Sequence, residues 1–329
     1  MIRSVIPGWM GICWKKLLLV TEKAPAEPNH GIGIVSYQFF LDWSVPVVTH
    51  PFYFGIPLRS KRASNDWDLV CTNLQRTLRN LVNQTDQRFG IVLACHEIPS
   101  FFQSKTLADD APLIRAKVHI ISLKDIFPPP RDVSEFSRDK ARKKRAMGAY
   151  LRSIGADDFY FMHFDADDLL RADFVGNVLC NDNRAGYLIA NGYLLDMSTG
   201  ELALSNSGKS PFYMHCGSCA AIHLENTDLP TSLNDTNCIF SLYKNHTQYE
   251  AVSRGRGKPL TRLDEYNAIY CVNHGDNNRI HRGKGDLKER YVKRRRTTNY
   301  LHLHAVRTRF PAAHWRRRSV GWRWSNLFR

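Results

Sequence analysis

The chain of 329 residues lacks any long uninterrupted apolar run, and no stretch of eighteen consecutive apolar residues occurs in it. A helix that crosses a membrane needs about 20 such residues, so we expect no transmembrane span. Residues 1–20 resemble a signal sequence, but Lys15 and Lys16 interrupt the apolar run and no small-residue cleavage pattern follows. We therefore expect no signal peptide either. The apolar fraction of 43% is that of a globular protein with a core.

Cysteine is sparse as well. Eight cysteines are scattered over the chain, too few for the disulfide scaffold of a small secreted protein. Cys216 and Cys219 form one Cys-x-x-Cys pair with His215 and His223 nearby, but zinc would need a second pair, and none has suitable spacing. A redox pair would be expected at a helix start in a thioredoxin-like unit, which the pattern does not indicate. We expect a tight turn at 217–218, buried thiols and a reducing, cytoplasmic compartment.

Acidic residues are nearly absent from the end of the chain. From residue 281 to residue 329, fifteen Lys or Arg stand against two acidic residues, so this segment carries +13 of the net charge of +15. Residues 1–280 are nearly neutral, which argues against nucleic-acid binding as the main function. The tail interleaves Arg with tryptophans at 315, 322 and 324. This mixture favours an anionic membrane surface, with nucleic acid or an appendage without a partner as the alternatives.

Strand-like and helical patterns alternate from residue 45 onward. Continuous apolar runs predict strands at 45–54, 88–97, 118–123 and 159–164. We also expect a short strand at 31–37, a hairpin over 185–204 and a strand broken by a Gly-Ser loop over 211–224. One helix is predicted after the cap Asp66, and a second over 139–154, ended by Gly155. The first helix has an apolar face, formed by Val70, Leu74, Leu78, Leu81 and Val82. The pattern indicates an α/β fold with a mostly parallel sheet covered on both faces, in which ligands gather at the carboxyl ends of the strands.

Carboxylates follow the last of these strands directly. Residues 159–170 read FYFMHFDADDLL, and Asp165, Asp167 and Asp168 cannot be buried without partners. A calcium loop is excluded because leucines occupy its fifth and sixth positions. An aspartyl-nucleophile phosphohydrolase and a solvated turn between strand and helix both remain open. The cluster is therefore either a cation site or a structural turn.

The surrounding segments resemble a family 2 glycosyltransferase with the GT-A fold. The order is VPVVTHPFYF, the helix through TLRNLVNQT, the strand of RFGIVLACHE and then DADD, over roughly residues 45–175. The chain departs from the family in the turn FYFGIPLRSKRASND and in Glu97, where members usually have Asp. The resemblance implies a nucleotide-sugar-binding half at 45–175, with Glu97 in the donor site. A smaller mixed acceptor half follows at 176–283, between an extension at 1–44 and the basic tail at 284–329.

The resemblance also implies a donor site with a divalent cation. Oxygen ligands suit Mn²⁺ or Mg²⁺ bound to a diphosphate. We expect Asp167 to bind the metal, Asp165 to bind metal or ribose, and Asp168 to do either. Three further residues complete this expectation: Lys140 or Lys144 facing the diphosphate, and His274 as a late metal ligand. The alternative interpretation of the helix with the two lysines is a solvated basic face, and the alternative for His274 is a surface turn.

An inverting transferase needs a carboxylate that removes the proton of the acceptor hydroxyl. The spacing in the family fits Asp264 and Glu265, and it also fits Asp235. The expected function is metal-dependent transfer from a nucleotide-diphospho-sugar to a glycan or lipid-linked acceptor, at the inner face of a membrane. The alternatives are a membrane-surface or nucleic-acid binding protein with a structural DADD turn, and a phosphohydrolase with Asp165 as nucleophile.

Overall fold

The computed structural model describes residues 18–20, 38–40, 49–102, 111–208, 210–275 and 285–311. Strands β1 (Leu18–Val20) and β2 (Gln38–Phe40) pair antiparallel in a small sheet of their own. The short strand expected at 31–37 and the tail tryptophans lie outside the described residues. None of the helices in the described part of the chain is both long and apolar enough to cross a membrane.

The first half of the chain alternates between strands and helices, as expected. Its elements are β3 (Phe52–Pro57), α1 (Trp67–Val82), β4 (Phe89–Cys95), α2 (Ala111–Lys117), β5 (Val118–Ser122), α3 (Phe136–Ser153) and β6 (Phe159–His163). The Asp66 side chain caps α1 by accepting a hydrogen bond from the Leu69 backbone N–H. Helix α3 begins three residues before the predicted start, and Gly155 follows its end with φ +70°. The predicted strands β4, β5 and β6 and both helices are confirmed.

The first predicted strand was placed too early. Strand β3 starts at Phe52 and continues through Gly55 to Pro57, whereas the prediction ended it at residue 54. Gly55 belongs inside the sheet because a Cβ there would lie 2.3 Å from the Phe161 ring. The glycine is therefore a point of close packing in a central strand, and not a terminator.

The second half of the chain adds strands of both directions. Its elements are β7 (Leu169–Leu170), α4 (Phe174–Asn181), β8 (Tyr187–Asp196), β9 (Leu202–Ser205), β10 (Ala220–Leu224), α5 (Ile239–Leu242), α6 (Tyr249–Gly255) and β11 (Thr261–Val272). The expected hairpin is β8 with β9. The expected strand at 211–224 is wrong in its first part, because residues Phe212–Met214 form a 3₁₀ turn, η4, before β10. The Phe212 ring occupies the space where Gly192 has no side chain.

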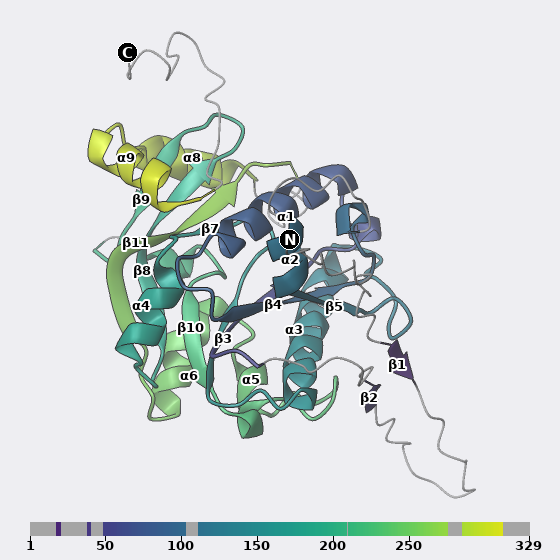
Figure 1. Ribbon diagram of the computed structural model, residues 1–329. Coiled ribbons are helices and arrows are strands. Elements are labelled where there is room, and N and C mark those ends of the chain that lie inside the picture. Colours follow the sequence, from purple (N-terminus) through teal and green to yellow (C-terminus); the bar gives the residue numbers. More distant parts are fainter. Residues whose placement is uncertain are drawn as a thin grey trace, which may run out of the picture.

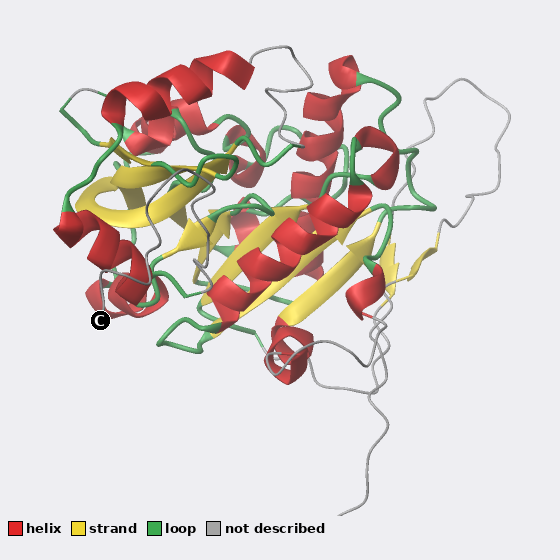
Figure 2. Cartoon of the chain, turned by 90° about the horizontal axis from the view of Figure 1, so that it is seen from above, coloured by secondary structure: helices red, strands yellow, loops and turns green. Residues whose placement is uncertain are grey.

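In the described residues nine strands form one sheet, in the order β5-β4-β3-β6-β10-β8-β11-β7, with β9 paired to β8. The pairs within β5-β4-β3-β6 are parallel, and β11 is parallel to β8. Strands β10, β7 and β9 run antiparallel to their neighbours. Figure 2 shows the resulting twisted sheet between helices. The expected α/β class with a mostly parallel, mixed sheet is confirmed.

Helices cover both faces of the parallel part of the sheet. Figure 1 shows α1 and α2 above the strands and α3 and α5 below them. On the lower face, a Cβ at Gly148 of α3 would lie 2.7 Å from Pro230. Because β3, β4 and β6 are parallel, their carboxyl ends lie at one edge of the sheet, where polar side chains can gather.

The described part of the basic segment is folded. Helices α8 (Gly285–Arg295) and α9 (Tyr300–Arg309) pack on the strands of the second half. Val292 is fully buried against Leu194 and Val272, and Val306 joins a cluster with Ile269. These helices are therefore part of the globular body.

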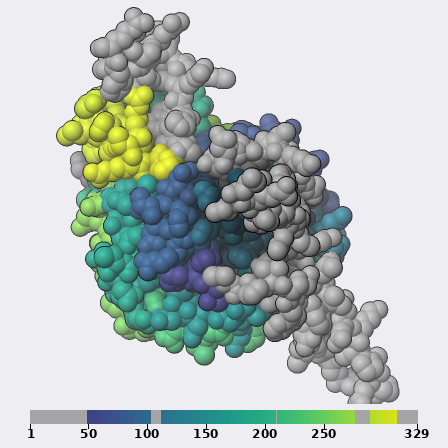
Figure 3. Space-filling view, in the orientation of Figure 1, coloured from purple at the N-terminus to yellow at the C-terminus, as the bar shows by residue number. Residues whose placement is uncertain are grey.

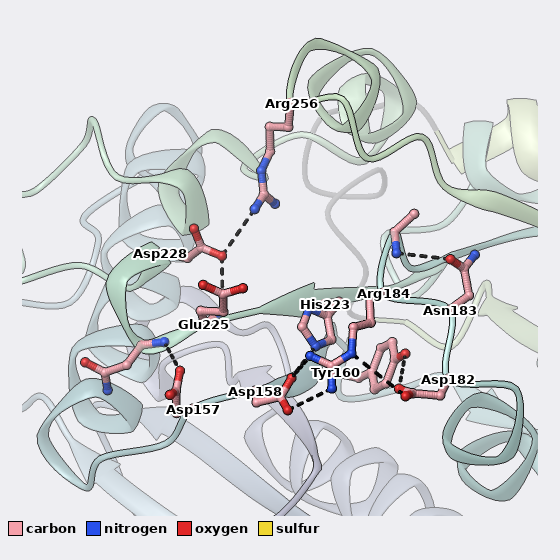
Figure 4. A network of polar contacts seen from close by, with 12 residues as sticks. Asp157, Asp158, Tyr160, Asp182, Asn183, Arg184, His223, Glu225, Asp228 and Arg256 are labelled. Carbon is pink, nitrogen blue, oxygen red and sulfur yellow. Dashed lines mark hydrogen bonds and ion pairs between the residues drawn. The ribbon is translucent and has the colours of Figure 1, made fainter.

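Charged residues at the amino end of β6 compensate one another. Figure 4 shows Asp158 between His223 and Arg184. Its carboxylate lies 2.9 Å from His223 Nε2 and accepts a hydrogen bond of 2.9 Å from Arg184 Nη2. Tyr160 donates to the carboxylate of Asp182 over 3.0 Å. These contacts fix one end of β6 and leave the carboxylates at its other end as the cluster to be explained.

Candidate functional site

The DADD segment lies in a cleft at the carboxyl end of β6. The cleft is lined by β3 and the loop after it, by α1 and α3, by the DADD segment and by the end of β11. Its lining residues are Pro57, Leu58, Arg59, Ala63, Val70, Asn73, Pro130, Phe136, Asp139, Lys140, Lys143, Asp165, Ala166, Asp167, Tyr270 and His274. The structure therefore brings together four of the expected site residues, Lys140, Asp165, Asp167 and His274.

Asp165 is held from two sides. Its Oδ1 lies 2.6 Å from Lys140 Nζ, and its backbone N–H donates to Ser218 Oγ over 2.8 Å. Burial acts to lower the pKa of Lys140, but Asp165, together with Asp167 and Asp168, outweighs it and holds that pKa above its ordinary value. Lys140 is thus a fixed positive charge, with about a third of its side chain exposed.

Asp167 and His274 form the most unusual contact of the cleft. Asp167 Oδ2 lies 2.6 Å from His274 Nε2, and the two side chains are 22% and 5% exposed. The nitrogen is nevertheless buried without a hydrogen bond, because the contact lacks hydrogen-bond geometry. Burial acts to raise the pKa of Asp167, but His274 and then Lys140 outweigh it and hold that pKa below its ordinary value. A carboxylate oxygen and an imidazole nitrogen therefore lie side by side, and each is a group that can bind a divalent cation.

The other ring nitrogen of His274 has a partner on α1. Asn73 Nδ2 lies 3.2 Å from His274 Nδ1. Rotating the Asn73 amide by half a turn exchanges its donor for an acceptor, so Asn73 can hold either tautomer of the ring. A ring that binds a cation through Nε2 carries its proton on Nδ1 and needs such an acceptor.

Asp168 faces away from the cleft. It is fully buried, and its Oδ2 accepts hydrogen bonds from Ser218 Oγ at 2.7 Å and Cys216 Sγ at 3.0 Å. Its Oδ1 accepts from the Cys271 backbone N–H at 3.2 Å. Burial, and then the neighbouring carboxylates Asp167 and Asp165, raise the pKa of Asp168 well above its ordinary value. Asp168 therefore anchors the loop, and the expected turn at 217–218 with two buried thiols is part of this anchor.

Polar side chains on α1 and directly after its end hold the backbone after Asp167, and the sequence analysis missed them. Thr77 donates to the Asp168 carbonyl at 3.0 Å, and Gln84 donates to the Arg171 carbonyl at 2.8 Å. Asn80 bonds both the N–H and the C=O of Leu170, at 2.6 and 2.9 Å. The available signal was the spacing of three between Thr77 and Asn80 on α1, which Gln84 continues four residues later, after the helix has ended.

Lys144 and Glu97 are not among the residues that line the cleft. Lys144 is buried, with Nζ 3.4 Å from both the Lys244 carbonyl and the Tyr249 hydroxyl. Burial, and then Lys140, lower the pKa of Lys144 to about 7. Glu97 is half-buried and accepts a hydrogen bond of 2.9 Å from the Lys61 backbone N–H. It therefore ties the loop after β3 to the end of β4.

The three carboxylates expected as the acceptor base do not line the cleft. Asp264 and Glu265 are exposed near the start of β11, seven and six residues before Cys271. At about 3.3 Å per residue this is roughly 20 Å along the strand from the anchor of Asp168. Glu265 pairs with Arg171. Asp235 accepts hydrogen bonds within its own loop, including one of 3.1 Å from the Cys238 backbone N–H.

His246 is a titratable group of the acceptor half that lies within electrostatic range of Asp165 and Lys140, although it is not among the residues that line the cleft. It lies in the 3₁₀ turn η6 (His246–Gln248), and a hydrogen bond links it to the backbone of Met214. Burial lowers its pKa, and Asp165, Lys140 and Lys144 act on it electrostatically. His246 is therefore an uncharged imidazole at neutral pH beside the charged cluster.

Within the described ranges no three His, Cys, Asp or Glu side chains gather in a group that could hold a metal ion by themselves. Asp167 and His274 thus offer two ligands, which suits an ion that takes its remaining ligands from water and a bound phosphate. No family model matches this chain, and no curated protein sequence matches it. Its function is therefore inferred from the geometry of the site.

Proposed function

We propose that this protein is a metal-dependent glycosyltransferase of GT-A type, which transfers a sugar from a nucleotide-diphospho-sugar to a hydroxyl of a glycan or lipid-linked acceptor. The observation that carries the proposal is the pair Asp167 and His274, whose oxygen and nitrogen lie 2.6 Å apart without a hydrogen bond. The pair lies in a cleft at the carboxyl ends of parallel strands, where α/β proteins bind nucleotides.

The residues fit a divalent cation. Mg²⁺ and Mn²⁺ accept carboxylate and imidazole ligands and usually keep open positions for water and phosphate. Asp167 and His274 would hold the ion, which when bound supplies positive charge to the departing diphosphate. Asn73 would orient His274 for this role.

Lys140 is the residue proposed to face the diphosphate. Its ion pair with Asp165 fixes the ammonium group in the cleft, and its pKa keeps it charged. Lys143 also lines the cleft, but its Nζ is bound by Asp139 at 2.6 Å and by the Leu58 carbonyl at 2.7 Å. Lys143 therefore stabilises the wall of the cleft, while Lys140 retains room for an anionic ligand.

Apolar residues suited to a nucleoside line the other side of the cleft. Pro57, Leu58, Ala63 and Val70 lie there, and Arg59 lies over the Phe136 ring at 5.4 Å. Ligand sites of this kind combine an apolar wall with a few polar groups. Glu97 takes part indirectly in this proposal, because it fixes the loop that carries Ala63.

His246 is proposed to accept the proton of the acceptor hydroxyl, in place of Asp264, Glu265 or Asp235. Its bond to the Met214 backbone orients the ring, and its lowered pKa keeps it neutral and able to take a proton. It belongs to the half of the chain that follows the donor-side strands.

A thermal-shift panel tests the proposal. Wild type and Asp167→Asn are heated with UDP-, GDP-, dTDP- and CMP-linked sugars, with and without Mn²⁺, and Asp125→Asn on an exposed turn is the matched control. One nucleotide class should raise the melting temperature of wild type and of the control only with the metal, and Asp167→Asn should lose this rise. If no donor and no metal shifts the wild type, the DADD turn is structural. A trapped phosphate on Asp165 without affinity for sugar nucleotides would instead indicate a phosphohydrolase.

A further inference from the structure

Helix α8 and the residue after it carry a high density of positive charge. Between residue 289 and residue 296, five basic residues stand against the single acid Glu289. Val292 attaches this stretch to the sheet, and residues 285–311, yellow in Figure 3, lie at the margin of the molecule. The basic residues are Arg290, Lys293, Arg294, Arg295 and Arg296, and all except Arg295 are exposed. An anion in solution can therefore reach this stretch.

Arg290 and Arg294 differ from the other exposed charges of this stretch. They lie one helical turn apart, and within the described residues they form neither an ion pair nor a hydrogen bond. Like charges at this spacing repel each other. The other exposed charges are compensated by ion pairs, Lys293 with Glu289 at 2.7 Å and Arg296 with Glu201 at 3.4 Å. Arg290 and Arg294 are therefore the two cations of this stretch that the described residues leave uncompensated.

These two arginines line a shallow hollow on α8, together with Tyr291 and Arg295. The Arg295 guanidinium lies over the Tyr291 ring, 5.2 Å from its centroid, which holds the charge of Arg295 at the hollow. Three guanidinium groups are thus presented to one space. None of the four residues lines the cleft that contains the DADD segment, so the hollow is a separate site.

The hollow is attached to the body of the protein through Tyr291 and its neighbour. The Tyr291 hydroxyl donates a hydrogen bond of 3.3 Å to the Leu204 carbonyl on β9, and its ring lies 4.7 Å from the His215 ring, measured between centroids. His215 is itself held by Ser210, whose Oγ lies 2.6 Å from His215 Nε2. Val292, the next residue of α8, is fully buried. The arginines therefore extend from a helix turn that is fixed on the sheet.

We propose that this hollow binds the terminal phosphate group of a ligand, that is, a phosphate monoester. Arginine guanidinium groups bind phosphate oxygens through paired, charge-assisted hydrogen bonds. A phosphate monoester carries a charge of about −1.5 to −2 at pH 7, which matches the two uncompensated cations Arg290 and Arg294. A phosphate diester, such as a nucleic-acid backbone phosphate, carries one charge and matches them less well. The site goes beyond sugar transfer, because it shares no residue with the cleft.

Isothermal titration calorimetry of the full chain with methyl phosphate and with dimethyl phosphate tests the proposal. Wild type should bind the monoester at least about tenfold more tightly than the diester, and Arg290→Gln combined with Arg294→Gln should weaken monoester binding at least about tenfold. Lys293→Gln combined with Arg296→Gln is the matched control, because it removes the same charge from the same stretch and leaves the hollow intact. The control should bind the monoester within about twofold of wild type.

Vesicle sedimentation distinguishes the sources of the phosphate. A lipid headgroup is indicated if vesicles of phosphatidylcholine with phosphatidic acid, a monoester, sediment wild type but not the Arg290/Arg294 variant. A soluble ligand is indicated if methyl phosphate binds and these vesicles do not. The proposal is overturned if neither probe binds, if monoester and diester bind alike, or if the two double variants lose binding equally. All four substituted side chains are exposed, so wild-type melting temperatures are expected, and no readout depends on sugar transfer.

Discussion

His274 Nε2 lies 2.6 Å from Asp167 Oδ2, because Asp167 precedes β7 by two residues and His274 follows β11, the antiparallel neighbour of β7, by two residues. The contact is close for two polar atoms that share no hydrogen bond. The fold therefore holds two potential ligands of a cation side by side, and Asn73 contacts the other nitrogen of the His274 ring.

The first prediction concerns Asn73. Asn73→Leu removes the amide that contacts His274 Nδ1 while keeping similar volume, so the ring loses its fixed orientation. We expect the apparent affinity for Mn²⁺ to fall by about 10- to 100-fold. Metal titrations of donor-dependent thermal stabilisation measure this. Asn83→Leu, at the exposed end of the same helix, should leave the affinity unchanged, and equal losses in the two variants would contradict a specific role of Asn73.

The second prediction concerns the attachment of the DADD loop to α1. Asn80 is fully buried and bonds the N–H and the C=O of Leu170, so Asn80→Ala leaves both groups unpaired in the interior. We expect a loss of roughly 2 to 4 kcal/mol in the free energy of unfolding. Urea denaturation measures it. Asn83→Ala, which removes a single exposed hydrogen bond to Arg79, should change stability by less than about 1 kcal/mol.

The third prediction concerns close packing at Gly55. A Cβ there would lie 2.3 Å from the Phe161 ring and 3.2 Å from Met147 Sδ, so Gly55→Ala must displace buried side chains. We expect destabilisation of about 1 to 3 kcal/mol. The control is Gly255→Ala on α6, where an added Cβ meets nothing within 4 Å. A thermal melt that shows equal effects at both glycines would rule out the packing explanation.

The fourth prediction concerns the buried Lys144, whose pKa of about 7 is below its ordinary value of 10.5. Between these two pH values the unfolded chain binds more protons than the folded chain, so the free energy of unfolding rises with pH in this window. The cost of Lys144 is therefore greatest below the folded pKa and disappears above the unfolded one. Lys144→Met should stabilise the protein by roughly 2 to 4 kcal/mol at about pH 6, and by less at about pH 9.

Urea titrations at both pH values measure this difference. Lys124→Met, on an exposed turn, is the control and should show no change of effect with pH. A gain from Lys144→Met that is equal at both pH values would mean that the lysine is charged to the same extent in the folded and unfolded chains.

The fifth prediction separates the candidates for the acceptor base. His246→Asn should lower kcat by about 100-fold or more and remove the acidic limb of the pH–rate profile, because the residue would no longer take up a proton. Asp264→Asn should retain kcat within about twofold, since Asp264 is exposed and lies roughly 20 Å along β11 from the anchor of Asp168. The reverse pattern in steady-state kinetics with a hydroxyl acceptor would return the role to Asp264.

Several features of the fold could be predicted because their causes are local. The cap Asp66 and the apolar face of α1 identify a helix, and continuous apolar runs identify β4, β5 and β6. The bounds of β3 were missed because glycine often ends a strand. Gly55 instead packs against Phe161, a residue far away in the chain, and a local pattern does not reveal that contact. The start of β10 was missed for a similar reason, the docking of Phe212 on Gly192.

Two features could be read from the order of residues alone: carboxylates follow a buried strand, and the end of the chain is basic. Which groups meet depends on the folded chain, which brings Asp167 to His274, Asp165 to Lys140, and Asp168 to the turn at 217–218. Neighbouring aspartates receive different environments because successive side chains in the turn point in different directions. The physical reason is that local sequence sets helix and strand preference, whereas the order and direction of strands follow from how buried faces pack across the whole chain.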